Sequence, residues 1–103
     1  MKKVSKESDL LVCLALNFNP REVKDFNIKY FTHSDNETTY MVTLEDGIIE
    51  QNGIYMAILP SQELTKMQEG QLCSIVTICR EDSKFPDQDY NEIIKQNLDI
   101  WLN

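Results

Sequence analysis

The sequence has few of the residues that mark several common classes of protein. Its 103 residues include only three glycines and three prolines, too few for a collagen-like repeat or a long flexible linker. The single histidine, His33, stands in a polar segment, so no set of nucleophile, base and orienting group can be assembled around it. We therefore expect a folded domain that is not an enzyme and needs no cofactor.

Positive charge is also scarce, because ten lysines and arginines face seventeen acidic residues and give a formal net charge of -7 at pH 7. A nucleic-acid-binding protein needs a basic stripe that neutralises phosphates, so DNA and RNA are not expected partners. No apolar run approaches the roughly 20 residues of a transmembrane helix. We expect no membrane contact.

The three cysteines are an odd number, so they cannot all pair within the chain. Cys73 and Cys79 lie in one extended segment, about 20 Å apart at the usual rise of a strand, which is too far for a disulfide. A bridge from Cys13 to either of them stays open, although thiols persist in reduced compartments. The close cysteine pairs of a zinc site are missing, and the sequence leaves the redox state undecided.

The N-terminal residues 1–8 are expected to form a disordered or solvated lead, followed by a single domain over residues 9–103. The lysines of the lead and the apolar run 10–16 superficially resemble a secretory signal. However, the run has only seven residues and follows acidic side chains, and no small-residue cleavage site comes after it. We expect no secretion.

The segment 71–80 is the strand around which the domain is expected to be built. It has no glycine or proline, and β-branched or small apolar residues occupy both alternating registers. This pattern predicts a central strand that is covered on both faces.

Alternation with a period of two predicts four more strands, at 10–18, 25–32, 38–45 and 54–59, and favours a strand over a helix at 94–102. The dipeptides Asp46-Gly47 and Asn52-Gly53 accept positive φ and predict tight hairpin turns on either side of a short edge strand, 48–51.

A short helical segment is predicted after Pro60. Ser61 is the candidate N-cap of one or two helical turns, and these turns would place Leu64 and Met67 over an open end of the core. About seven short strands with one helical turn are typical of an all-β antiparallel sandwich of immunoglobulin-like or fibronectin-like type. The tryptophan and the paired cysteines of antibody domains are missing, and the order of the strands stays open.

The polar loop 82–92 contains oxygen ligands at alternating spacing, which is the chemistry that calcium prefers. It lacks the glycine of an EF-hand loop, and Pro86 comes ahead of the cluster, so a solvated acidic hairpin loop is the alternative and no metal ligand is assigned. Phe85 and Tyr90 belong to the same loop. They either anchor a binding partner or fold back over the end of the sandwich.

Apolar side chains exceed what one small core can hold. Both registers of the first strand are apolar, whereas a strand in a two-layer sandwich should have one wet face. Leu11 and Cys13 are therefore predicted to contact another subunit. Ile48 belongs to the short edge strand, where a partner strand could add.

Trp101 is the fourth predicted interface residue. It falls on the opposite register from the apolar residues Leu98, Ile100 and Leu102. It is therefore either exposed or the anchor of a contact, and tryptophan is enriched at the centres of interfaces. The alternative is that Trp101 packs under the N-terminal lead.

A family resemblance adds to these observations. The succession Glu45-Asp46-Gly47, the segment 52–60 ending in Pro60, a short capping turn, Gly70-Gln71-Leu72 and a long apolar strand resembles the N-terminal β-sandwich of phage baseplate and tail proteins. The loop 82–87 (Asp-x-x-Phe-Pro-Asp) resembles a loop of small sandwich proteins that prophages of gut bacteria encode near their tail genes. The resemblance covers roughly residues 25–102.

The resemblance implies a non-enzymatic structural or assembly module of a phage or prophage-derived particle, with no catalytic residues. Its partners would be proteins, either copies of itself in a homo-oligomer or other components of the particle. It would be cytoplasmic before assembly and part of the virion afterwards. The alternative function is a cell-surface adhesion or carbohydrate-binding sandwich that uses Phe85 and Tyr90.

Overall fold

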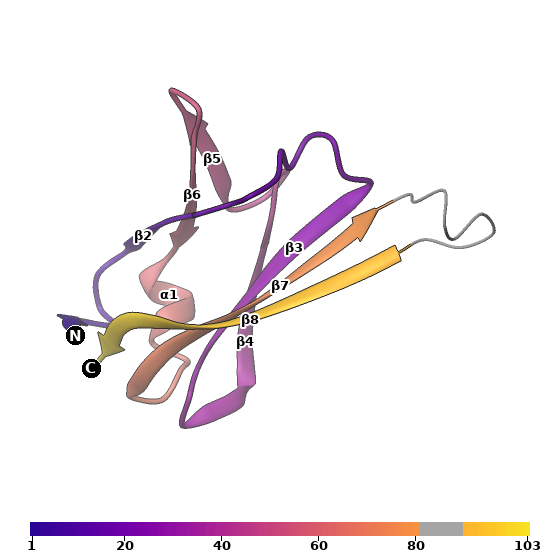
Figure 1. The fold of residues 1–103 in the computed structure, drawn as a ribbon. Helices are drawn as coiled ribbons and strands as arrows, with labels where there is room; N and C mark the ends of the chain where they lie inside the picture. The colour runs from indigo at the N-terminus through magenta and orange to yellow at the C-terminus, as the bar shows by residue number, and fades with distance from the viewer. Residues whose placement is uncertain (81–89) are drawn as a thin grey trace.

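The computed structural model describes residues 1–80 and 90–103, which form two β-sheets packed face to face (Figure 1). Sheet A has five strands in the order β1-β8-β7-β3-β4, and sheet B has three in the order β2-β6-β5. In chain order the elements are β1 (Lys2–Val4), β2 (Leu10–Cys13), β3 (Asp25–Thr32), β4 (Asp35–Thr43), β5 (Ile48–Gln51), β6 (Ile54–Leu59), α1 (Ser61–Leu64), β7 (Gly70–Arg80) and β8 (Tyr90–Leu102). The predicted all-β sandwich is confirmed.

The order of the strands, which the sequence left open, is that of an immunoglobulin-like sandwich. Sheet B corresponds to strands B, E and D, and β8-β7-β3-β4 correspond to G, F, C and C′. The helical turn α1 lies between the strands that correspond to E and F. The first strand differs from that of a constant-type domain, because β1 joins sheet A at the edge of β8.

The N-terminal lead contains a strand that the sequence analysis did not predict. Lys2–Val4 pair in parallel with Ile100–Leu102, the backbone N–H of Lys6 donates to the carbonyl of Asn103 at 3.0 Å, and the N–H of Asn103 donates to the carbonyl of Val4 at 3.0 Å. The expected antiparallel arrangement is therefore wrong at this edge. The described residues form eight strands where about seven were predicted.

The strand β7 lies in the middle of sheet A, between β8 and β3, as predicted. Its inward side chains Leu72, Val76 and Ile78 are buried. On the outward face Cys73 is buried, but Ile75 and Cys79 are only half-buried. The expected burial of both faces is thus only partly right, because only the neighbouring side chains of sheet A cover the outward face.

The helical turn closes one end of the core as predicted. Leu64 and Met67 have exposed fractions of 0% and 2%. Ser61 is not the N-cap, because Pro60 holds that position and no side chain of the turn caps it. Instead, the carboxylate of Asp9 accepts a hydrogen bond from the backbone N–H of Ser61 at 2.8 Å and satisfies one donor of the first turn.

Several strand ends differ from the prediction because strand pairing determines them. β2 ends at Cys13, not at residue 18, because its partner β6 begins at Ile54. Only one further hydrogen bond forms between them, from the N–H of Leu14 to the carbonyl of Tyr55 at 2.9 Å. β4 begins three residues early, because Asp35 already pairs with Thr32. β8 begins at residue 90, not at 94.

The two Asp-Gly and Asn-Gly turns have different roles. Asn52 and Gly53, with φ of 54° and 79°, form the predicted hairpin between β5 and β6. Gly47 also has a positive φ, of 94°, but β4 and β5 belong to different sheets. The predicted hairpin at Asp46-Gly47 is therefore wrong, and this turn carries the chain from sheet A to sheet B.

Candidate functional site

The outward surface of sheet B is the most unusual surface of the described chain. Alternate residues of its strands point inward and are buried (Leu10, Val12, Ile48, Ala57 and Leu59). The residues between them point away from sheet A. We call this set the sheet B face: Leu11, Cys13, Ile49, Gln51, Ile54, Met56 and Ile58.

The side chains of the sheet B face form one contiguous surface across three strands. Leu11 lies opposite Ile58, and Met56 lies between Cys13 and Ile49. Leu11, Ile49 and Ile54 are 58%, 40% and 54% exposed. Six of the seven side chains are apolar or thiol, and none carries a charge. Contiguous apolar surfaces on soluble proteins are often functional.

The size of the sheet B face limits what it can bind. Three strands about 4.8 Å apart and up to six residues long, at about 3.3 Å per residue, cover on the order of 300 Å². A stable protein interface buries about 800 Å² on each partner. The sheet B face by itself therefore supports a weak contact, or one contact among several.

The four predicted interface residues do not lie together. Leu11 and Cys13 are exposed on the sheet B face, whereas Ile48 points inward and is only 8% exposed. The exposed neighbour on the same edge strand is Ile49. A strand of four residues gives no sequence signal for its inward register, so the side of Ile48 follows from its pairing with Ala57.

Trp101 belongs to a different surface. It lies on β8 in sheet A and is half-buried, with Lys3 of β1 as its neighbour in register. Its indole N–H donates to the Glu69 carboxylate at 3.4 Å. Trp101 therefore lies beside the N-terminal strand, away from the sheet B face.

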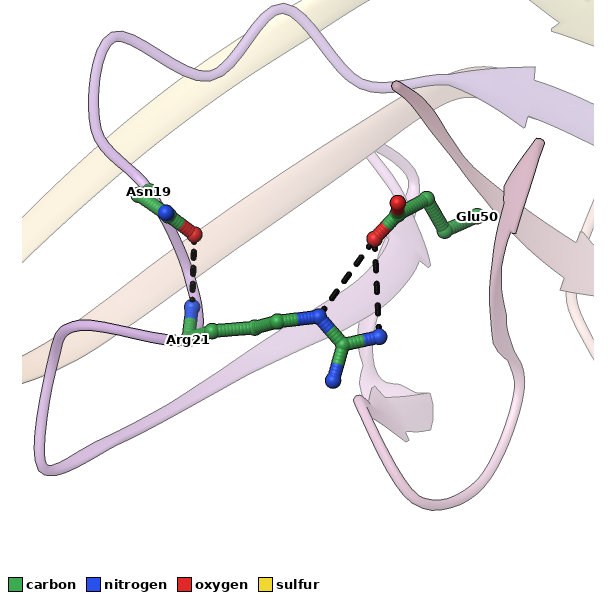
Figure 2. Close-up of polar contacts among 3 residues, drawn as sticks. All are labelled: Asn19, Arg21 and Glu50. Carbon is green, nitrogen blue, oxygen red and sulfur yellow. Dashed lines mark hydrogen bonds and ion pairs between the residues drawn. The ribbon is translucent and has the colours of Figure 1, made fainter. Parts of the chain in front are cut away.

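An ion pair lies at the end of sheet B. The Arg21 guanidinium, on the connection between β2 and β3, donates through Nε and Nη2 to Oε2 of Glu50, both at 3.4 Å, and the Arg21 backbone N–H donates to Oδ1 of Asn19 at 3.0 Å (Figure 2). The pKa of the Glu50 carboxyl lies below its usual range, mainly because Tyr55 donates a hydrogen bond to it and secondarily because of Arg21. The charge of Glu50 is thus compensated within the chain.

The outward surface of sheet A has a different composition. One row across it runs from Met41 through Lys29 and Ile75 to Lys95, so cationic and apolar side chains alternate. Ile93 is 60% exposed on the same surface. Interspersed charges are typical of a solvated sheet face.

The remaining sequence-based candidates give no site in the described residues. Phe85 and most of the acidic loop lie outside them, and Tyr90 is described only as the first residue of β8. Within residues 1–80 and 90–103, no three histidine, cysteine or acidic side chains are grouped to hold a metal ion. All three cysteines are thiols, with Cys13 exposed and Cys73 buried.

No helix in the described part of the chain is long and apolar enough to cross a membrane. Comparison of the chain with protein-family models, with curated protein sequences and with solved structures gave no match. The resemblance to phage tail sandwiches stays a prediction, and the geometry of the sheet B face is the main guide to function.

Proposed function

We propose that this chain is a non-enzymatic assembly module that associates with a second copy of itself through the sheet B face. The observation that carries the proposal is the continuous exposed apolar surface of β2, β6 and β5, which has no charged side chain. Contiguous apolar surfaces of a few hundred Å² are often functional in a soluble chain.

The uncharged sheet B face allows a second copy as the occupant, although each chain has a net negative charge. Each copy has a formal net charge of -7, and like charges placed opposite one another across an interface cost several kcal/mol. Two copies that meet through their sheet B faces place no charged side chain in the contact. Such a contact is two-fold symmetric, with the same surface on both partners.

The small area of the sheet B face makes a single contact weak and concentration-dependent. In an array of many copies, weak contacts add because each one raises the effective concentration for the next. This behaviour suits a repeated subunit of a larger particle.

The proposed particle is a phage or prophage-derived tail or baseplate. Its support is the resemblance of the turn succession and of the long apolar strand β7 to phage tail sandwiches. In this proposal the chain folds in the cytoplasm and becomes part of the virion on assembly. The carbohydrate-binding alternative depends on Phe85 and Tyr90, whose side chains the structure does not describe.

Two matched variants test the proposal. Ile54→Lys places a charge on the sheet B face, and Ile93→Lys places the same charge on sheet A at a residue of similar exposure, 54% against 60%. We expect sedimentation velocity to show reversible self-association of the natural chain as its concentration rises. Ile54→Lys should stay monomeric, and Ile93→Lys should behave like the natural chain.

Either of two results would overturn the proposal. One is a natural chain that stays monomeric at every concentration. The other is an equal loss of association in the two variants, because that would place the contact outside the sheet B face. Thermal unfolding of both variants controls for folding, and since both residues are exposed we expect small changes in stability.

A further inference from the structure

A polar row crosses the inward face of sheet A. Tyr30 of β3 has Ser74 of β7 as its neighbour in register, and Ser74 has Gln96 of β8 on its other side. Tyr30 is 1% exposed and Ser74 is 3% exposed. The adjacent row, with Ile28 beside Val76, is apolar. Two hydroxyl groups therefore lie next to an apolar row of the interior.

Both residues border a cavity of about 160 Å³ between the two sheets. One wall is the connection that follows β2, with Leu14, Leu16 and Phe18. The other wall consists of side chains of β7 and β8, apolar at Val76, Ile94 and Leu98 and polar at Ser74 and Gln96. In the described part of the chain, β1 pairs only with the C-terminal end of β8. No described strand therefore closes the side of the sandwich where the cavity lies.

No hydrogen bond joins either hydroxyl to a described residue, and neither oxygen is among the fully buried side-chain atoms that lack a partner, so a water-sized molecule in the cavity can reach both. Burial, with no hydrogen bond, raises the pKa of Tyr30 well above its usual range. Polar groups in the interior of native proteins are nearly always satisfied by protein, water or ligand. The two hydroxyls therefore need a partner that occupies the cavity.

The volume and the lining identify the size and chemistry of that partner. An apolar cavity of about 150 Å³ accepts one benzene ring, whereas sites for drug-sized ligands have about 300–1,000 Å³. About five water molecules would fill the space at ~30 Å³ each. Most of the lining side chains are apolar and offer these waters no hydrogen bonds, whereas Tyr30, Ser74, Asn17 and Gln96 do.

We propose that this cavity binds a small molecule with an apolar, ring-sized body and one hydrogen-bonding group, held between the hydroxyls of Tyr30 and Ser74. Phenol has this size and chemistry and is the probe for the test. Benzene has the same body without the hydroxyl group and is the matched control ligand.

The test is a titration followed by NMR of labelled methyl groups. Phenol should shift the signals of Val76, Ile94 and Leu98 in the cavity and leave those of Ile54 and Ile93 unchanged. Benzene should bind at the same place about tenfold more weakly, since it lacks one hydrogen bond. The double variant Tyr30→Phe with Ser74→Ala should lose this preference and keep its affinity for benzene.

Stability without ligand gives an independent measurement. Tyr30→Phe removes a hydroxyl that lacks a protein partner, so the melting temperature of the variant should equal or exceed that of the natural chain. Three results would overturn the proposal. The first is no saturable shift of the cavity methyl groups, because the cavity would then hold only water. The others are equal affinities for phenol and benzene, or a lower melting temperature for Tyr30→Phe. The Ile54→Lys variant should bind phenol normally, which separates this site from the sheet B face.

Discussion

The outward faces of the two sheets contain equally exposed apolar residues in opposite surroundings. Ile93 on sheet A and Ile54 on sheet B are 60% and 54% exposed. Charged residues occupy the outward register of sheet A, with Lys29 and Lys95 both beside Ile75, but none occupies that of sheet B. The neighbours in register, more than the exposure of one side chain, therefore distinguish the outward face of sheet A from the proposed interface on sheet B.

The areas of the two sheets explain why the chain can tolerate this difference. A wide uncharged sheet would associate indiscriminately, and charges on exposed strands prevent this. Sheet A has five strands, two more than sheet B, and its outward face carries the charges. In the proposed assembly, the smaller uncharged face of sheet B supplies a reversible contact.

The largest effect should come from breaking the attachment of sheet B to sheet A. Gly47 has a φ of 94°, and a Cβ there would lie 2.6 Å from Cγ1 of Val42. The strained backbone and the clash together should lower the free energy of unfolding of Gly47→Ala by about 3 kcal/mol. Thermal unfolding should then show a loss of more than about 10 °C.

Gly53 is the matched control for this change. Its φ is 79°, but a Cβ at Gly53 would meet no atom within 4 Å, so Gly53→Ala should cost only about 1 kcal/mol of strain. Equal losses in the two variants would contradict the crowding at Gly47.

The second prediction converts the face of sheet A into a copy of the sheet B face. Lys29→Ile combined with Lys95→Ile removes the charges from the row through Met41 and Ile75. Because this sheet is wider, we expect association at least about tenfold tighter than that of the natural chain, measured by sedimentation.

Replacement of the same two lysines by glutamine removes the charges without adding apolar surface. That variant should associate like the natural chain. Tight association of the glutamine variant would mean that net charge, and not the composition of the face, controls contact between copies.

The third prediction uses the thiols of the two faces. Cys13 is exposed on the sheet B face, whereas burial raises the pKa of Cys73 and its Sγ donates to Oδ1 of Asn97 at 3.3 Å. Because the thiolate is the reactive form, a maleimide should modify Cys13 at least about tenfold faster, as followed by mass spectrometry. A bulky label on Cys13 should reduce self-association, and Cys13→Ser should retain it.

The smallest effect concerns the ion pair at the end of sheet B. The pKa of Glu50 is lowered in the folded chain, mainly by Tyr55 and secondarily by Arg21. The ionised carboxylate therefore stabilises the fold above the ordinary glutamate pKa of about 4.3, and this contribution is lost as the pH falls through the lower folded value. Glu50→Gln should unfold at a slightly lower temperature than the natural chain at neutral pH.

Both members of this pair are exposed, so the difference is small. Melting curves of the two proteins should converge in acid. Tyr55→Phe should reproduce most of the loss, and a difference that persists below the folded pKa of Glu50 would contradict this assignment.

The sequence predicted the strands whose signals are local. β3, β5 and β6 have the predicted bounds because their side chains alternate or because Asn52-Gly53 forces a tight turn. β1 could not be predicted, since its pairing with β8 uses backbone groups of Lys2–Val4 and leaves no side-chain pattern. The change of sheet at Gly47 was missed for a related reason: an Asp-Gly turn serves a hairpin and a crossing equally well.

The candidate sites were predictable in part. The apolar residues on both registers of the first strand led to the prediction that Leu11 and Cys13 contact another subunit. Ile54 and Met56 joined them only when the pairing of β2 with β6 was known. The cavity beside Tyr30 depends on where the chain after β2 leaves sheet B. No local pattern encodes that position.

The parallel pairing of β1 with β8 determines how the fold responds to tension. Because the two strands run in the same direction, a pull on the start of β1 and the end of β8 acts along both strands in opposite senses. The register pairs from Lys2 with Ile100 to Val4 with Leu102 then resist together in shear, whereas an antiparallel pair pulled at its open ends would separate one bond at a time. A chain held in a particle by its two ends would extend only after these bonds break together.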